Sequence, residues 1–203
     1  MIDNSFREWL EPKTDFIVLC YTKMGISPNG LTLIGLIISI LSAISCYHEY
    51  NYTAILLWWI SRFFDGTDGI LARRTQKTSP FGAYIDILSD MASYSFMIIA
   101  MALRFPEMIL LWLTTIFLYI LCITSALSLG QLLKESNIQI KNNRGLNLGA
   151  GLIEGGETGM AYTIFLLASD HIKVLLVIWV ILLTITVILR TFLAFKMLKG
   201  AKQ

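Results

Sequence analysis

Four aspartates stand within 26 positions of this 203-residue chain, at the ends of two hydrophobic segments. Asp65 and Asp68 are three residues apart and Asp86 and Asp90 are four apart, so each pair falls on one face of a helix. An ionised carboxylate near an apolar core costs several kcal/mol unless it is paired or binds metal. Because both pairs have helical spacing, the four aspartates indicate a functional site rather than a set of solvated acids.

Two facing acid pairs are suited to divalent metal chemistry. Carboxylate oxygens suit Mg²⁺ or Mn²⁺, which usually bridge to substrate phosphates. Two pairs can hold two ions, which would neutralise a diphosphate and activate an attacking oxygen. One acid would remain free enough to act as a general base. Gly69 and Gly82 lie on the acid-bearing faces and allow a helix or a phosphate to approach closely.

The loop between the two acid pairs is short and basic, with Arg73, Arg74 and Lys77. The two helices are therefore expected to be antiparallel neighbours whose acids converge at one end. Arg62, three residues before Asp65, is expected to pair with an acid.

The elements that position these acids are apolar segments long enough for a membrane. The chain is 56% hydrophobic and only 15% charged, against roughly 25% charged in soluble domains. A helix needs about 20 residues to cross a bilayer and satisfies its own backbone there. Six segments qualify as candidates, although the first is short and the second carries charges: about 31–47, 53–71, 82–103, 108–133, 148–169 and 172–195. We expect an all-α polytopic membrane protein with six transmembrane helices in one domain, 1–203.

The segment before the first span mixes apolar and charged residues over 3–23. This pattern favours an amphipathic helix that lies in the membrane interface, within an interfacial segment 1–27.

Basic residues are distributed unequally between the two sides of a six-span arrangement. The side with both termini and the acid loop collects twelve lysines and arginines, whereas the other holds only Arg104 and Lys173. Cytosolic loops carry the excess of positive charge. We therefore expect a multi-pass protein of the cell (inner) membrane, with both termini and the active site in the cytosol.

The acid-rich stretch resembles the signature of the CDP-alcohol phosphotransferase family at every fixed position. The eight fixed residues are Asp65, Asp68, Gly69, Ala72, Arg73, Gly82, Asp86 and Asp90. Successive members of this series are separated by two, zero, two, zero, eight, three and three residues. The resemblance implies displacement of CMP from a CDP-linked lipid, such as CDP-diacylglycerol, by a soluble alcohol. It also implies a homodimer surrounded by membrane lipid, and no nucleic-acid partner.

The resemblance assigns a role to each of these residues. Asp65, Asp68 and Asp86 would bind the metal ions, and Asp90 would be a further ligand and the base that deprotonates the acceptor. Near the start of the first span, Pro28, Asn29 and Thr32 resemble a Pro-Asn and Thr of the family. The residues expected to bind CDP are Asn29, Thr32, Asp68, Gly69, Ala72, Arg73 and Gly82.

The acceptor is not determined by the signature. Members that use phosphorylated acceptors carry basic residues near the end of span 4 and the start of span 5, where this chain reads SALSLGQLLKESN and GLIEGGETG. The latter is similar to a bacterial subgroup whose acceptor is unassigned. We name Arg144, Glu154, Glu157 and Arg190 as candidate acceptor-binding residues and favour an acceptor without phosphate, such as a polyol, amino acid or amino alcohol. A phosphorylated acceptor such as glycerol 3-phosphate is the alternative.

Two other classes of membrane protein also carry intramembrane acids. A cation or proton transporter needs polar groups through the whole membrane depth, whereas these acids cluster at one end beside a basic loop. A UbiA-like prenyltransferase has more spans and separates its two Asp motifs widely. Both remain as remote alternatives.

Overall fold

A computed structural model describes residues 14–135 and 155–199, which form helices and turns with no strand among them. Two short 3₁₀ turns join successive helices: η2 (Pro106–Met108) links α5 to α6, and η3 (Ser169–His171) links α7 to α8. The α-helices are α2 (Thr14–Lys23), α3 (Pro28–Tyr47), α4 (Asn51–Arg74), α5 (Pro80–Arg104), α6 (Ile109–Glu135), α7 (Gly155–Leu167) and α8 (Ile172–Lys199).

Helices occur where the six apolar segments were predicted, and the ends of α3, α4, α5, α6 and α8 fall within four residues of the expected bounds. The predicted segment 148–169 begins outside the described residues, and α7 covers its second part. Four helical stretches are long and apolar enough to cross a membrane: α3, α5, η2 with α6, and η3 with α8. Every 18-residue stretch of α4 contains Arg62, Asp65 and Asp68, which keeps α4 out of this group.

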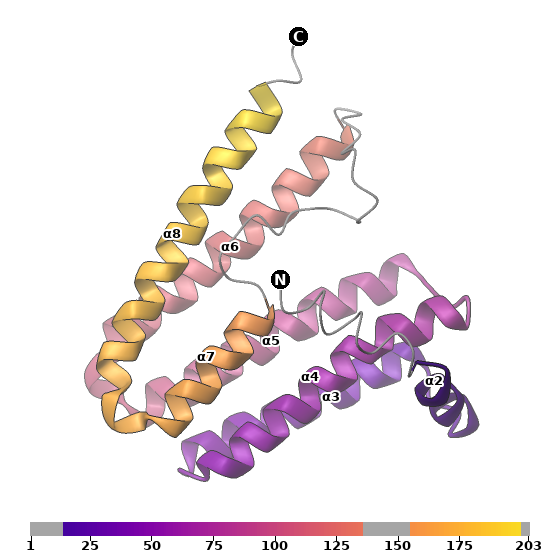
Figure 1. The fold of residues 1–203 in the computed structure, drawn as a ribbon, viewed down its shortest axis with the longest axis horizontal. Coiled ribbons are helices and arrows are strands. Elements are labelled where there is room, and N and C mark those ends of the chain that lie inside the picture. The colour runs from indigo at the N-terminus through magenta and orange to yellow at the C-terminus, as the bar shows by residue number, and fades with distance from the viewer. Residues whose placement is uncertain (1–13, 136–154, 200–203) are drawn as a thin grey trace.

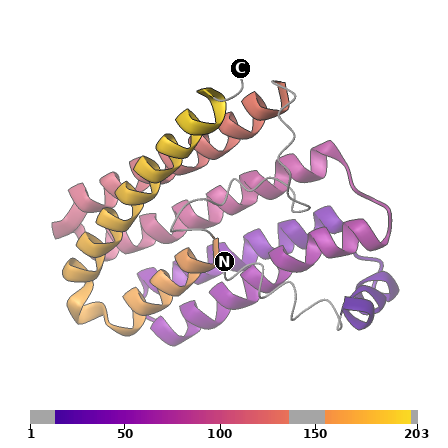
Figure 2. The same ribbon diagram turned by 45° about the horizontal axis from the view of Figure 1, so that its top comes forward.

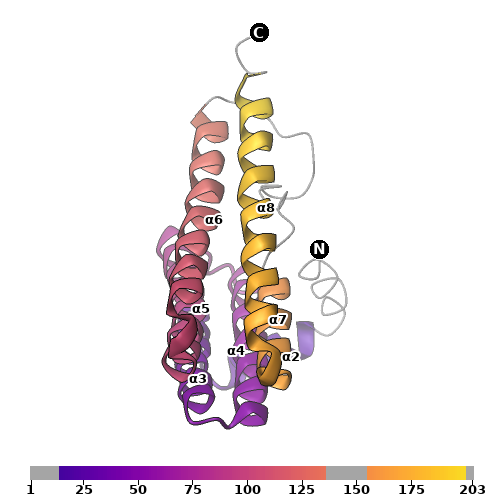
Figure 3. The same ribbon diagram turned by 90° about the vertical axis from the view of Figure 1, so that its left-hand side faces the viewer.

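The six long helices form two layers, as Figure 3 shows. One layer contains α3, α5 and α6, and the other contains α4, α7 and α8. Across the layers α3 packs closely along α4 and α6 along α8, while α3 packs along α5 within its layer. Figure 1 shows that the C-terminal halves of α6 and α8 extend together beyond the rest of the bundle. Figure 2 shows α3, α4 and α5 running alongside one another, with α2 at the end where α4 and α5 are joined.

The core between the layers is rich in aromatic residues. Trp58 on α4 contacts the rings of Tyr94 on α5 and Tyr162 on α7. Tyr162 also donates a hydrogen bond to the Tyr94 carbonyl (3.1 Å) and is fully buried. The outward faces instead expose large apolar side chains, for example Leu33 and Ile37 on α3. An apolar exterior around a packed interior is what a lipid environment requires.

Two similar helix starts fix the positions of residues that matter for the site. Ser27 caps α3 by accepting a hydrogen bond from the Gly30 N–H (3.1 Å), and Ser79 caps α5 by accepting one from the Gly82 N–H (3.0 Å). A proline stands at the first position of each helix, where its missing N–H costs nothing. Because Ser27 provides the cap, the side chain of Asn29 is not needed for it.

Candidate active site

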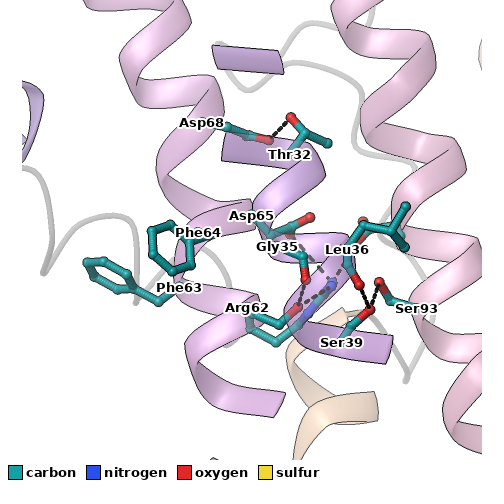
Figure 4. Close-up of polar contacts among 12 residues, drawn as sticks. Thr32, Gly35, Leu36, Ser39, Arg62, Phe63, Phe64, Asp65, Asp68 and Ser93 are labelled. Carbon is teal, nitrogen blue, oxygen red and sulfur yellow. Dashed lines mark hydrogen bonds and ion pairs between the residues drawn. The ribbon is translucent and has the colours of Figure 1, made fainter. Parts of the chain in front are cut away.

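The two acid pairs lie on α4 and α5 near the loop that joins these helices. Arg62 on α4 shows how closely the pairs approach each other. Its Nη1 is 2.5 Å from Asp90 Oδ1 and 3.6 Å from Asp65 Oδ2, and Figure 4 shows it reaching along α4 toward Asp65. One cationic group therefore contacts a carboxylate from each helix, as expected for acids that converge on one site.

Helix α3 holds both acid-bearing helices in place. The Thr32 hydroxyl of α3 donates a hydrogen bond to Asp68 of α4 (Figure 4). Ser61 of α4 donates to a backbone carbonyl of α3 (2.8 Å), and the hydroxyls of Ser39 on α3 and Ser93 on α5 are 2.8 Å apart. The two helices were expected to be antiparallel neighbours whose acids converge, and Arg62 does contact an acid of each helix. Both helices pack closely on α3, whereas α4 and α5 make few close backbone approaches to each other.

A pocket of about 190 Å³ opens beside the acids, at the end of the bundle where α3 and α5 begin and α4 ends. All seven residues predicted to bind CDP line it, and so does Asp86. The described lining residues are Pro28, Asn29, Thr32, Asp68, Gly69, Ala72, Arg73, Lys77, Thr78, Ser79, Gly82, Ala83 and Asp86. Residues distant in sequence, from α3 and from the α4–α5 unit, are thus brought to one cavity.

The pocket has an acidic and a basic side. Asp68 and Asp86 supply carboxylates, while Arg73 and Lys77 supply positive charge. This arrangement suits a ligand that carries phosphates together with a metal ion. From the sequence Lys77 was predicted only to belong to a basic loop, and no role was predicted for the loop residues 78 and 79. The signal that could have identified them is their position between the two acid helices.

Two glycines keep space open in the pocket lining. A Cβ atom on Gly82 would lie 3.2 Å from both Asn29 Oδ1 and Ser79 Oγ, which is closer than side chains normally approach. A Cβ atom on Gly69 would lie 3.2 Å from Arg73 Nη1. Both glycines therefore leave room that a larger residue would take from the pocket or from the side chains that line it.

The acids have the chemistry of a metal site, but their side chains are engaged with protein groups. Within 14–135 and 155–199, no three acidic, histidine or cysteine side chains are arranged to hold one ion. Arg62 engages Asp65 and Asp90, and Thr32 engages Asp68. Hard carboxylate oxygens that already surround a cation fit Mg²⁺ or Mn²⁺ after local rotation of these side chains.

The candidate acceptor-binding residues are scattered. Arg144 and Glu154 lie outside the described residues. Glu157 is half-buried in the first turn of α7. Arg190 on α8 is 7% exposed and donates from Nη1 to the backbone carbonyl of Cys122 on α6 (2.5 Å), while its buried Nε has no partner among the described residues. Neither Glu157 nor Arg190 lines the pocket.

Comparison with known proteins identifies the family to which the chain belongs. The family model described as CDP-alcohol phosphatidyltransferase matches residues 25–189. An archaetidylinositol phosphate synthase from Pyrococcus horikoshii is 36% identical over 80 residues, covering 39% of this chain and 43% of the relative. The inner membrane protein YnjF of Escherichia coli is 32% identical over 107 residues, covering 53% and 52%. The chain thus spans about half the length of these curated relatives.

Solved structures share the fold. The phosphatidylinositol phosphate synthase of Mycobacterium tuberculosis with CDP-DAG bound is 17% identical, with a TM-score of 0.65 over 90% of this chain and 93% of that one. The same protein in complex with manganese and citrate gives a TM-score of 0.64 at 16% identity, over 90% and 88%. Both likenesses cover the whole helical arrangement, not the pocket alone.

Proposed function

Since the chain belongs to the CDP-alcohol phosphatidyltransferase family, we propose that it transfers a phosphatidyl group from a CDP-linked lipid, such as CDP-diacylglycerol, to an alcohol and releases CMP. The observation that carries the proposal is the pocket, because the seven residues expected to bind CDP line one cavity next to the acids. The binding of CDP-DAG by the related M. tuberculosis synthase supports the same class of donor.

The nucleotide end of the donor occupies this pocket in the proposal. Arg73 and Lys77 contact the phosphates with charged donors, and Gly69 allows the diphosphate to approach the α4 backbone. Asn29 and Thr32 on α3, with Ala72 and Gly82, surround the nucleoside. Since the pocket is at the end of the bundle, CMP can leave to water while the acyl chains remain along the apolar helix faces.

Asp65, Asp68, Asp86 and Asp90 would hold Mg²⁺ or Mn²⁺, in our proposal two ions. Bound metal would supply positive charge that stabilises the diphosphate and the leaving CMP phosphate. The manganese complex of the M. tuberculosis synthase supports this assignment. Asp90 would also take the proton from the acceptor hydroxyl, as the family resemblance implies. Its carboxylate contacts Arg62 and is not among the residues that line the pocket.

The acceptor enters from the other side of Asp90. We propose an acceptor without phosphate, which Glu157 and Glu154 contact through hydroxyl or amino groups. A phosphorylated acceptor, such as glycerol 3-phosphate, is a second candidate, bound by Arg190 and Arg144. It is favoured by one observation: the buried Arg190 guanidinium keeps an unpartnered Nε within the part of the chain that the structure describes.

We further propose that α4 and α7 complete six spans in a single membrane domain of the cell membrane. Both helices pack within the bundle beside candidate spans. The distribution of basic residues supports a cytosolic location for the termini and the pocket. In the proposal the segment before α3 lies in the interface, and a homodimer is the family expectation. Cysteine labelling at Lys77 and Glu107, in a variant without native cysteines, should show opposite accessibility; labelling of both from one side would contradict this topology.

The experiment that tests the proposed function uses purified protein, CDP-diacylglycerol, Mn²⁺ and a panel of alcohols with and without phosphate. CMP release should depend on one class of alcohol and should fall to background in Asp86→Asn. Glu107→Gln is the control, because Glu107 lies in η2 at the opposite end of α5. Equal CMP release by Asp86→Asn and Glu107→Gln would contradict the assignment of this pocket as the CDP-binding site.

A further inference from the structure

Arg62 is a charged side chain placed inside the acid cluster rather than at its edge. Its side chain is 12% exposed, and Nη1 contacts Asp90 of α5 and Asp65 of its own helix. An arginine three residues before an aspartate was expected simply to pair with an acid. Arg62 instead joins two carboxylates that belong to two different helices. In particular, the Asp90 contact joins α5 to α4, where close backbone packing is sparse.

The guanidinium is held by rings as well as by acids. Its Cζ atom lies 5.0 Å from the centroid of Trp58 and 5.4 Å from that of Tyr94. Its Nη2 donates to Ser61 Oγ at 3.3 Å. Cation–π contacts with buried rings are stronger than those at a surface. The position of Arg62 is thus set by α4 and α5 together.

A guanidinium and a divalent ion both need the same carboxylate oxygens. The oxygen of Asp90 that accepts from Arg62 at 2.5 Å has one lone pair occupied, and the guanidinium beside it repels a divalent ion that approaches the same carboxylate. Without any cation, Asp65 and Asp90 would repel each other in a poorly hydrated site. Arg62 therefore has two effects. It neutralises part of the negative charge of the acids when metal is absent, and it weakens the binding of a metal ion to them.

We propose that Arg62 is a built-in cation that holds Asp65 and Asp90 together in the metal-free protein and competes with divalent metal for them. The proposal rests on the proposed function, since it requires that the aspartates bind metal. It follows that Asp90 is turned toward Arg62 until metal is bound. Arg62 is accordingly a positioning residue, which acts on the acceptor only through Asp90.

The test compares Arg62→Met with Arg62→Lys and the wild-type protein. Methionine keeps length and apolar packing against the two rings but has no charge, whereas lysine keeps the charge without the planar fork. Mn²⁺ binding to purified protein is measured by electron paramagnetic resonance, and thermal unfolding is followed in EDTA and in Mn²⁺. Arg104→Met is the matched control, because Arg104 also stacks on a ring, that of Phe105, at 5.0 Å, but lies at the far end of α5.

Arg62→Met should bind Mn²⁺ about tenfold more tightly than wild type, within the range typical of coupling between competing ligands. It should unfold at lower temperature in EDTA, and Mn²⁺ should raise its Tm by more than it raises that of the wild type. Arg62→Lys should also bind Mn²⁺ more tightly than wild type, by a smaller factor, and Arg104→Met should match wild type. A purely structural role would instead lower Tm equally with and without metal.

Mn²⁺ affinity in Arg62→Met that equals or falls below that of the wild type would overturn the inference and would show that Arg62 supports the metal ligands instead. Where Arg62→Met does not fold, Arg62→Lys decides by the same comparison. Failure of the proposed function has a separate signature: wild type would not bind Mn²⁺, or Asp68→Asn would bind it undiminished. That outcome would remove the basis of the inference as well.

Discussion

Two arginines inside the bundle, the largely buried Arg62 on α4 and the buried Arg190 on α8, are held in different ways. Arg62 is engaged by two carboxylates and two aromatic rings. Arg190 donates to a backbone carbonyl of α6, and within the described chain it forms no ion pair. A buried charge without an opposite charge is costly.

The difference distinguishes two regions of the bundle. Around α3, α4 and α5 a guanidinium contacts carboxylates, and a pocket brings together the residues expected at the nucleotide. Between α6 and α8 the guanidinium of Arg190 has no ion pair within the described residues, and the candidates Arg144 and Glu154 lie outside them. In the function that we propose, the first region is the donor half and the second is the acceptor half.

Removal of metal should have the largest effect and should act on the donor half alone. With EDTA, CMP release should fall to background, because four clustered carboxylates cannot stabilise a diphosphate without metal. Asp65→Asn and Asp68→Asn should each lower turnover by more than about 10²-fold, since even the hydrogen-bond partners of metal ligands are worth 10- to 100-fold. Mn²⁺ affinity should fall with activity in both variants. Full activity in EDTA would contradict the metal assignment.

Asp90→Asn should separate chemistry from donor binding. Loss of a general base typically costs about 10²-fold or more in turnover, whereas the donor pocket is lined by other residues. Binding of CDP-diacylglycerol, measured by equilibrium competition with CMP, should therefore survive better than turnover does. Near-native turnover in Asp90→Asn would exclude Asp90 as the base.

Replacing a closely packed glycine by alanine should affect activity less than loss of a catalytic acid does, and the effect should depend on where the glycine lies. In Gly82→Ala the new Cβ presses on Asn29 Oδ1 at 3.2 Å, which should raise the KM for CDP-diacylglycerol roughly fivefold, or about 1 kcal/mol. In Gly159→Ala on α7 the Cβ would lie 3.0 Å from Trp58 Nε1, outside the pocket. That variant should leave this KM unchanged. Equal changes in both variants would show that the two regions are not separable.

The residues of the proposed donor half could be grouped from the sequence because they are close in the chain. Eight of them lie within 26 positions on two helices, and helical periodicity places each acid pair on one face. Their roles follow from the family resemblance and stay predictions. The role of α3 was predicted only at Asn29 and Thr32, because the Ser39–Ser93 contact joins residues 54 apart that have no local pattern. The position of Arg62 between the two acid helices could not be predicted for the same reason, since it depends on how α5 packs against α3.

The acceptor half was less predictable for a related reason. Helices α6 and α8 are apolar around their whole circumference, so periodicity does not say which way Arg190 points. Its direction is set by packing between residues 68 apart, Cys122 and Arg190. The number of spans was equally undetermined, because the charges that make α4 functional also make it less apolar.

The smallest effects are expected at the acceptor. With an acceptor that lacks phosphate, Arg190→Met should change its KM by less than about threefold, because the guanidinium would make no direct contact with it. Glu157→Gln should raise the same KM by more, since it removes a charged hydrogen-bond acceptor. Efficient use of glycerol 3-phosphate, lost in Arg190→Met and retained in Glu157→Gln, would reverse this assignment and identify Arg190 as a phosphate ligand.

The most direct measurement follows the phosphatidyl phosphorus itself. CDP-diacylglycerol labelled at that phosphorus is incubated with purified protein, Mn²⁺ and the best alcohol of the panel, and labelled lipid and CMP are both quantified. We expect one labelled phosphatidyl-alcohol for each CMP released, with both products lost in Asp68→Asn and kept in Glu107→Gln. CMP accompanied only by labelled phosphatidic acid, or product formation that survives in Asp68→Asn, would contradict it.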